Sequence, residues 1–179
     1  NLPNGLSIDA VTGTISGTPN ILSTVTTYTV TATNTGGSDT ITIDITVNDV
    51  IPSISYSGSP FTETKDQSMA PEAPTKSGGA VITWSISPSL PNGLTLSATT
   101  GVISGTPTVV SSTATYTISA TNSGGTGTTT VEITVNDIPP TNVAYSPSTL
   151  TLTKGELMTA VMPTSSGGAV VSWTVSPAL

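Results

Sequence analysis

Few residues in this chain could carry acid–base or nucleophilic chemistry. The sequence has 179 residues with ten carboxylates and three lysines, but no arginine, histidine or cysteine. A serine or thiol nucleophile ordinarily needs a histidine base, and acid–base catalysis by carboxylates needs two of them placed together. The carboxylates are scattered singly along the chain. We therefore expect no catalytic residues, no cofactor-binding residues and no enzyme activity.

Two lysines stand in similar surroundings and could serve a different chemistry. A buried lysine can form a covalent bond with an asparagine or aspartate when a nearby carboxylate assists. Lys65 is followed by Asp66 and Lys154 by Gly155, and both pairs are typical of turns. We therefore expect both lysines to lie in solvent.

The aromatic residues could offer stacking platforms for sugars, but their spacing favours a core. Trp84 lies between Ile82 and Ile86 in a segment that alternates apolar and polar residues, which places the three side chains on one strand face. The same alternation surrounds the second tryptophan and two tyrosines, so we expect four core aromatic residues: Trp84, Trp173, Tyr28 and Tyr116.

A repeat of about 88 residues organises the chain. Residues 2–49 recur 88 residues later, and residues 56–90 recur 89 residues later. Two repeat lengths therefore lead from Leu2 through Leu90 to Leu179, which occupies the same place in the pattern.

Prolines mark the joins between repeats. Pro52 follows Asn-Asp-Val-Ile, and Pro139 and Pro140 follow Asn-Asp-Ile, and proline cannot continue a central strand. The sequence thus predicts three parts: the C-terminal part of one repeat at 1–50, a complete repeat at 51–138, and the N-terminal part of the next at 139–179.

Both partial repeats would leave strand edges and an apolar face uncovered. We therefore expect either a window on a longer array or a filament unit whose ends are completed by neighbours. Tyr56 and Tyr145 lie near the joins and are candidates for packing between repeats.

A phrase that occurs twice carries turn chemistry. In its second copy, Pro91, Asn92 and Gly93 form a tight-turn triplet, Gly101 turns the chain between two short segments, and Gly105 ends the second segment. None of these residues is reactive, so the phrase directs folding.

Alternating apolar residues predict an all-β protein. Six to eight strands with frequent turns fit within about 88 residues, which is typical of a small antiparallel sandwich. The expected strands, besides one or two short ones in the recurring phrase, cover residues 53–57, 61–64, 81–86, 114–120 and 131–135.

The charge of the chain excludes some partners. A net charge of −7 with three cations gives no basic cluster, so we expect no nucleic-acid binding. No apolar run approaches the roughly 20 residues of a membrane helix, so we expect no membrane insertion by this segment.

The longest motif gives a family resemblance. It runs from Trp84-Ser85-Ile86 through Leu90–Leu94 and Thr100–Pro107 to Tyr116–Gly125 and Ile133–Asp137. These residues resemble the immunoglobulin-like repeats of large bacterial surface proteins, which are relatives of the cadherin-like sandwiches. The resemblance implies tandem immunoglobulin-like or cadherin-like sandwich repeats in extracellular proteins, without implying one biochemical activity.

The cadherin-like resemblance also implies candidate calcium ligands near the junctions between repeats. Calcium takes about six to eight oxygen ligands, usually including several carboxylates. The candidate ligands are Asp49, Glu132 and Asp137. Thr134 stands where the cadherin-like linker would have an acid, so we favour a polar strand end and a stiff proline linker, with no metal.

The sequence predicts a structural segment of an extracellular, cell-surface bacterial fibre, stalk or adhesin. It would act as a mechanical spacer whose partners are neighbouring repeats and, in a multi-chain filament, identical chains. Two alternatives stay open: a glycan- or ligand-binding module of an adhesin or secreted polysaccharide enzyme, and calcium-stiffened junctions.

Overall fold

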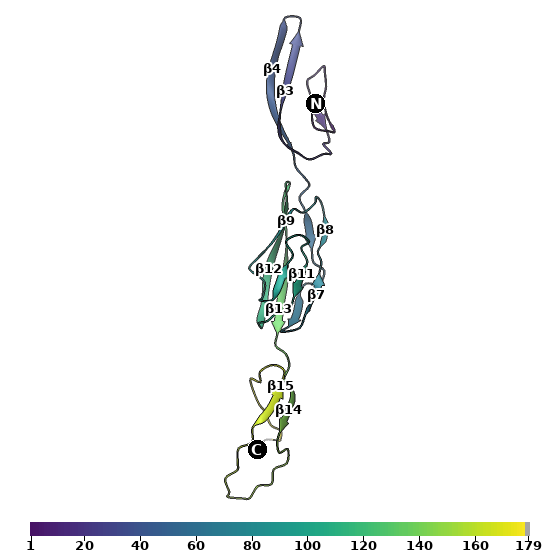
Figure 1. Cartoon of the computed structure of the whole chain (residues 1–179). Helices are drawn as coiled ribbons and strands as arrows, with labels where there is room; N and C mark the ends of the chain where they lie inside the picture. Colours follow the sequence, from purple (N-terminus) through teal and green to yellow (C-terminus); the bar gives the residue numbers. More distant parts are fainter. Residues whose placement is uncertain (178–179) are drawn as a thin grey trace.

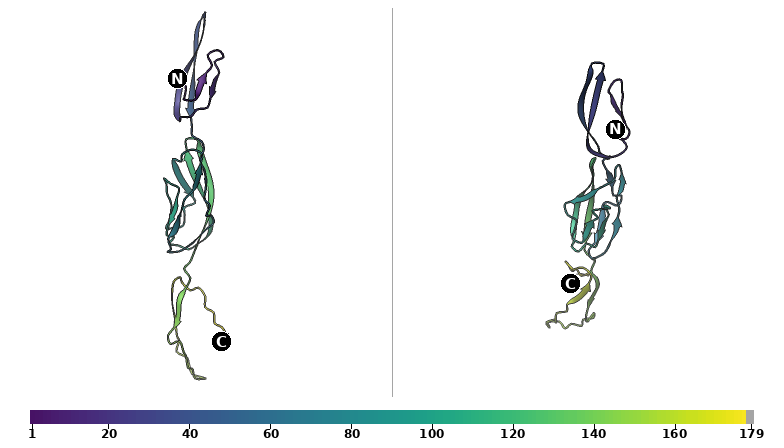
Figure 2. Two further views of the ribbon diagram at one scale, coloured as in Figure 1. Left: turned by 90° about the vertical axis from the view of Figure 1, so that its right-hand side faces the viewer. Right: turned by 45° about the horizontal axis from the view of Figure 1, so that its top comes forward.

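The computed structural model describes residues 1–177 and consists of strands and turns. Figure 1 shows three units that follow one another in a row, and Figure 2 shows the same row from two further directions. Within residues 1–177 there is no helix with the length and apolar character needed to cross a membrane. Leu179, which holds the same repeat position as Leu2 and Leu90, lies outside the described residues.

The central unit holds nine of the strands. They are β5 (Ser53–Ser55), β6 (Phe61–Thr64), β7 (Met69–Glu72), β8 (Thr75–Ser77), β9 (Thr83–Ser87), β10 (Leu94–Leu96), β11 (Ile103–Gly105), β12 (Ser111–Asn122) and β13 (Gly125–Asn136).

The strands of the central unit form three sheets. One sheet has the order β6-β13-β12-β9, a second has the order β10-β11-β7, and β5 pairs with β8. All pairs are antiparallel except β6 with β13, which run parallel. This arrangement confirms the predicted all-β sandwich.

The core lies between these sheets and follows from strand alternation. From Tyr116 onward on β12 and from Val131 to Val135 on β13 every second residue is buried, so Ile118 and Ile133 are fully covered while Thr117 and Glu132 face solvent. The core cluster comprises Ile54, Tyr56, Phe61, Met69, Trp84, Leu94, Ile103, Tyr116, Ile118, Ala120, Val131, Ile133 and Val135.

The outer units repeat parts of this pattern. The first unit contains β1 (Leu6–Ile8), β2 (Ile15–Gly17), β3 (Ser23–Asn34) and β4 (Gly37–Val47), paired as two hairpins. The third unit contains β14 (Thr141–Tyr145) paired with β15 (Pro163–Ser166).

Two details differ from the sequence predictions. Ile82 precedes strand β9 and is 69% exposed, so the prediction that it shares a buried face with Trp84 and Ile86 is wrong. Tyr56 is buried inside the central unit, where its hydroxyl donates to the carbonyl of Gly101, so it does not pack between repeats.

Candidate functional site: the junction between repeats

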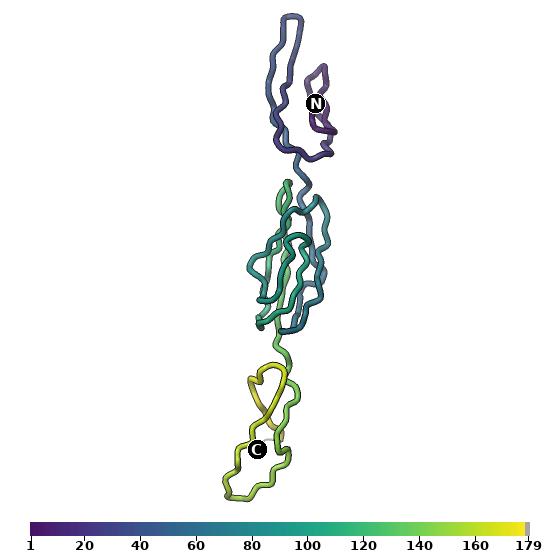
Figure 3. Tube along the Cα trace, in the orientation of Figure 1, coloured from purple at the N-terminus to yellow at the C-terminus, as the bar shows by residue number. Residues whose placement is uncertain are grey.

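The segment that joins the first unit to the central unit is held by the unit that it enters. Strand β4 ends at Val47, and only Asn48 separates it from Asp49, where the contacts with the central unit begin. Figure 3 shows this linker passing beside the tip of the long β12–β13 hairpin. We call the contacts of Asp49 and Val50 with this tip and with the Gly78–Ala80 turn the linker clasp.

Asn122 is the central side chain of the clasp. Its Nδ2 donates to the carbonyl of Val50 at 2.7 Å, and its Oδ1 accepts from the backbone N–H of Gly124 at 2.8 Å. Asn122 is the buried polar residue of the central unit, at 7% exposure. A buried amide must be hydrogen-bonded to avoid a desolvation penalty, so its two bonds fix the tip and the linker together.

Asp49 supplies the second set of clasp contacts. Its backbone N–H donates to the Ser123 hydroxyl at 3.0 Å, and its Oδ2 accepts from the N–H of Ala80 at 3.2 Å. Gly79 N–H donates to the carbonyl of Val50 at 3.0 Å. Both sides of the linker are therefore hydrogen-bonded to the central unit.

Glycines allow the linker to approach the hairpin closely. A Cβ on Gly124 would collide with the carbonyl oxygen of Asp49, and one on Gly127 would collide with that of Pro52. The hairpin must therefore present bare backbone at these points.

The same geometry begins again at the second junction. The carbonyl of Ile138 accepts from Gly168 N–H at 3.0 Å, as that of Val50 does from Gly79. Asp137 Oδ1 accepts from Ile138 N–H at 2.8 Å, as Asp49 Oδ1 does from Val50. The junction is thus a recurring structure.

The predicted turn residues lie away from the clasp. Leu94 N–H donates to the carbonyl of Pro91 at 3.0 Å, which closes a tight turn around Asn92 and Gly93. Gly93 has a φ of 94°, Gly101 lies against the Trp84 ring, and Gly105 ends β11.

The three candidate calcium ligands are not brought together. Asp49 and Asp137 occupy the linkers at opposite ends of the central unit, while Glu132 lies within β13, where its N–H donates to Ser59 at 3.0 Å. Among residues 1–177, no three acidic, histidine or cysteine side chains gather as a metal site would require.

One carboxylate pair does lie in the central unit, on β6 and β7. Burial, and then the charge of Glu72, raise the pKa of Glu63 above its ordinary value. The equivalent positions one repeat later are Leu152 and Val161, so the pair is not a feature of every repeat.

The four predicted core aromatics lie in two kinds of environment. Trp84 and Tyr116 are 7% and 5% exposed, so Trp84 offers no stacking face to a sugar. Tyr28 is half-buried and Trp173 is 50% exposed, because the outer units lack the strands that cover Trp84 and Tyr116 in the central unit. Tyr145 is 47% exposed.

Lys65 is partly exposed, as the turn residues after it suggested. Its Nζ lies 3.8 Å from the Oδ2 of Asp66, and its side chain is 37% exposed. Asp66 has a φ of 60° in the turn that follows β6.

Sequence reasoning missed the clasp residues Asn122, Ser123 and Gly79. The sequence does contain a signal for these clasp residues, because the asparagine and the Gly-Gly pairs recur at the repeat spacing. Hairpin-turn chemistry accounted for these residues, so their second contact, to a linker far earlier in the chain, needed the structure. Asn122 and Val50, for example, are 72 residues apart.

The fold and the repeating junction define a tandem immunoglobulin-like repeat protein. A family model described as "Putative Ig domain" matches residues 1–48 and again residues 49–136, and the chain belongs to this family.

Curated relatives carry the same kind of sequence. The chain is 36% identical over 148 residues to the "Serine-rich adhesin for platelets" of Staphylococcus aureus, covering 76% of this chain and 6% of the relative. The corresponding protein of strain MRSA252 is 35% identical over 147 residues, covering 76% of this chain and 10% of the relative. The chain thus spans a small part of these adhesins.

Among solved structures, the chain is similar to extracellular domains 3–5 of Drosophila OTK. The TM-score is 0.48 at 20% sequence identity, covering 75% of this chain and 47% of that one.

Proposed function

We propose that this chain is a spacer segment of an extracellular bacterial adhesin or fibre, in which stacked immunoglobulin-like repeats extend a surface protein without catalysing a reaction. The linker clasp is the observation that carries the proposal. With one residue between β4 and the clasp, the joint has little free chain with which to bend.

Three further features support a mechanical role. The relatives with matching sequence are adhesins. The sequence has no histidine or cysteine for nucleophilic chemistry, and its net charge of −7 favours solubility outside the cell. Because stacked repeats contact only their neighbours, the number of repeats sets the length of the array.

The test measures the freedom of the joint between the first and central units. Spin labels on Thr42→Cys and Thr130→Cys, exposed positions one repeat apart in a chain without other cysteines, report the distance between the two units. We expect a narrow distance distribution in the parent chain and a clearly broader one after Asn122→Ala, which removes the bond to Val50.

The matched control is Asn34→Ala, at the equivalent hairpin tip of the first unit, where Asn34 Oδ1 accepts from the N–H of Gly36 in its own turn. It should leave the distribution unchanged. Ser123→Ala, which removes one clasp bond and no buried amide, should broaden it to a smaller degree. A broad distribution in the parent chain, or equal widths in all variants, would refute a stiff spacer.

A further inference from the structure

The central unit places its first and last segments side by side. Its entering segment, residues 49–65, starts in the linker clasp and continues through β5 and β6, and its leaving segment is strand β13. Strand β13 runs from the hairpin tip beside the first junction to Asn136, and Asp137 then begins the second linker. The two segments therefore connect the central unit to its neighbours at opposite ends.

At the first junction the contacts follow the same order along both segments. The carbonyl oxygen of Asp49 lies against Gly124, and that of Pro52 lies against Gly127. Strand β5, which follows Pro52, also contacts β13. Residue numbers rise together on the two segments, so the linker runs in the same direction as β13.

The same direction holds as far as the second junction. The N–H of Glu132 on β13 donates to the Ser59 hydroxyl at 3.0 Å, and β6 then pairs with β13 in parallel. The pairing ends where Lys65 N–H donates to the carbonyl of Asn136 at 2.9 Å, at the last residue of β13. Parallel contacts between the entering and leaving segments thus extend from one junction to the other.

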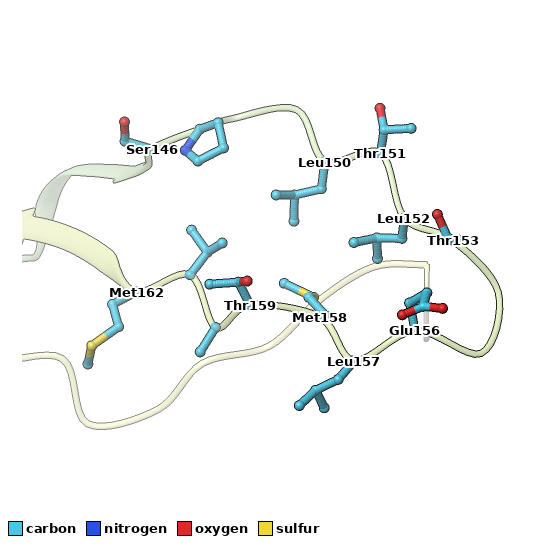
Figure 4. Close-up of a pocket in the computed structure, with 13 residues that line it drawn as sticks. Ser146, Leu150, Thr151, Leu152, Thr153, Glu156, Leu157, Met158, Thr159 and Met162 are labelled. Carbon is cyan, nitrogen blue, oxygen red and sulfur yellow. The ribbon is translucent and has the colours of Figure 1, made fainter.

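Strand β6 is found where β13 lies beside it. Its counterpart by the 89-residue offset, residues 150–153, is not a strand in the third unit. Figure 4 shows this stretch as a loop, on which Leu150 points toward the segment that carries Met158 while Thr151 points away. Pairing with β13 therefore accompanies the extended form of these residues.

Tension along the array would pull the two segments in opposite directions. The first unit is attached to the entering segment through Asn48, and the third unit is attached to β13 through Asp137, at the other end of the row (Figures 1 and 2). Parallel segments that are pulled from opposite ends slide along each other, so all of their contacts resist together. Segments that are pulled apart from one shared end lose their contacts one at a time.

We propose that the entering segment and β13 form a shear lock, which keeps the repeat folded while tension passes along the array. The lock rests on the proposed spacer function, because it is loaded only when the neighbouring units are pulled apart. Neither segment belongs to the sheet β10-β11-β7, so tension passes between the junctions without acting directly on that sheet.

The first test pulls the whole chain in two directions through handles on introduced cysteines, since the sequence has none of its own. Asn48→Cys with Asp137→Cys pulls along the array, whereas Gln67→Cys with Asp137→Cys separates β6 and β13 from their shared end. All three positions are exposed. At equal force the central unit should stay folded at least about 10-fold longer in the first direction, because several bonds must break together. Equal lifetimes, or a longer lifetime in the second direction, would overturn the proposal.

A second test removes single bonds to β13. Ser59→Ala removes the bond from the entering segment to Glu132, and the matched control Thr113→Val removes the 2.7 Å hydroxyl pair between β12 and Thr134. When the chain is pulled along the array, Ser59→Ala should shorten the folded lifetime about 5-fold and Thr113→Val by less than about 2-fold. Unfolding rates in urea without force provide the correction for general stability. Equal shortening after that correction would mean that the sandwich resists as a whole, and would also overturn the proposal.

The outcome for the lock can be separated from the outcome for the spacer. Spin-label distances report bending of the joint, whereas the pulling experiments report how long the repeat stays folded. A narrow distance distribution together with equal lifetimes in the two pulling directions would retain the spacer and refute the lock.

Discussion

The role of a single residue in this protein depends on the residues that it contacts. Asn122 would be a simple turn asparagine if its Oδ1 bond to Gly124 were its only contact. Its Nδ2 bond to Val50 makes it part of the joint as well. Equivalent positions in two repeats can thus hold the same residue type, while the role of each residue depends on the segment that packs against it.

Tyr56 shows how the surroundings of a residue also change its contribution to stability. Burial raises the pKa of its phenol from 10.0 to about 12. The folded state therefore favours the neutral phenol, and the contribution of Tyr56 to stability is complete below pH 10 and is lost as the pH rises from 10 to about 12.

We expect the melting temperature of the central unit to fall as pH rises from 10 to 12, followed by circular dichroism. Tyr56→Phe lacks the ionisable group, so its melting temperature should fall less over this range, although it should be lower at pH 7 because Gly101 loses a hydrogen bond. Tyr145→Phe, at the half-exposed equivalent position, should follow the parent chain. Identical pH profiles for the parent and Tyr56→Phe would contradict this assignment.

Gly101 gives a second prediction at the same scale. In Gly101→Ala the added methyl group meets both an unfavourable φ of 74° and the Trp84 ring at 2.6 Å. We expect a loss of about 2–4 kcal/mol in the free energy of unfolding of the central unit, measured by urea titration. Gly13→Ala has the same backbone strain without the ring, and should leave that transition in place.

At the scale of the elements, strands form where their pairing partners are present. Strands β6 and β9 flank the β13–β12 hairpin of the central unit. Their counterparts in the third unit, residues 150–153 and 172–176, have similar residues but no hairpin to pair with, and they are not strands. Strand β14 pairs with β15 within its own half, and both persist.

This dependence also explains how much of the fold the sequence predicted. The alternating segments with strong apolar patterns, such as 131–135 and 114–120, were predicted because burial on one face leaves a period of two. Strands β7 and β8 were missed because β7 contains Pro71 at the edge of its sheet and β8 is the polar Thr75-Lys76-Ser77. The clasp was missed because contacts over 72 residues leave no local pattern.

Equivalent substitutions in the two hairpins should therefore differ in cost. Ile133→Ala removes a fully buried side chain and should destabilise the central unit by about 2–5 kcal/mol. Ile45→Ala, at the same place on the half-buried face of β4, should change its stability by less than about 1 kcal/mol. Urea titration of the two variants, at concentrations below any self-association, makes the comparison. Similar losses would mean that the first unit has a core of its own.

For the whole molecule, the stiffness that we propose for the joint would rest on hydrogen bonds between protein groups. The Oδ1 and Oδ2 of Asp49 already accept from the N–H groups of Val50 and Ala80, and the Oδ1 of Asp137 accepts from Ile138. Calcium binding here would have to displace these bonds and recruit several further oxygen ligands.

We therefore expect the joint to behave alike with and without calcium. The distance distribution between labels at positions 42 and 130, and the melting temperature of the chain, should be the same in millimolar calcium and in excess chelator. Asp49→Asn keeps an acceptor for Val50 but removes the carboxylate charge available to a cation, so it serves as the control and should also be insensitive. A distribution that narrows on adding calcium in the parent chain, and fails to narrow in Asp49→Asn, would show instead that the ion holds the repeats in line.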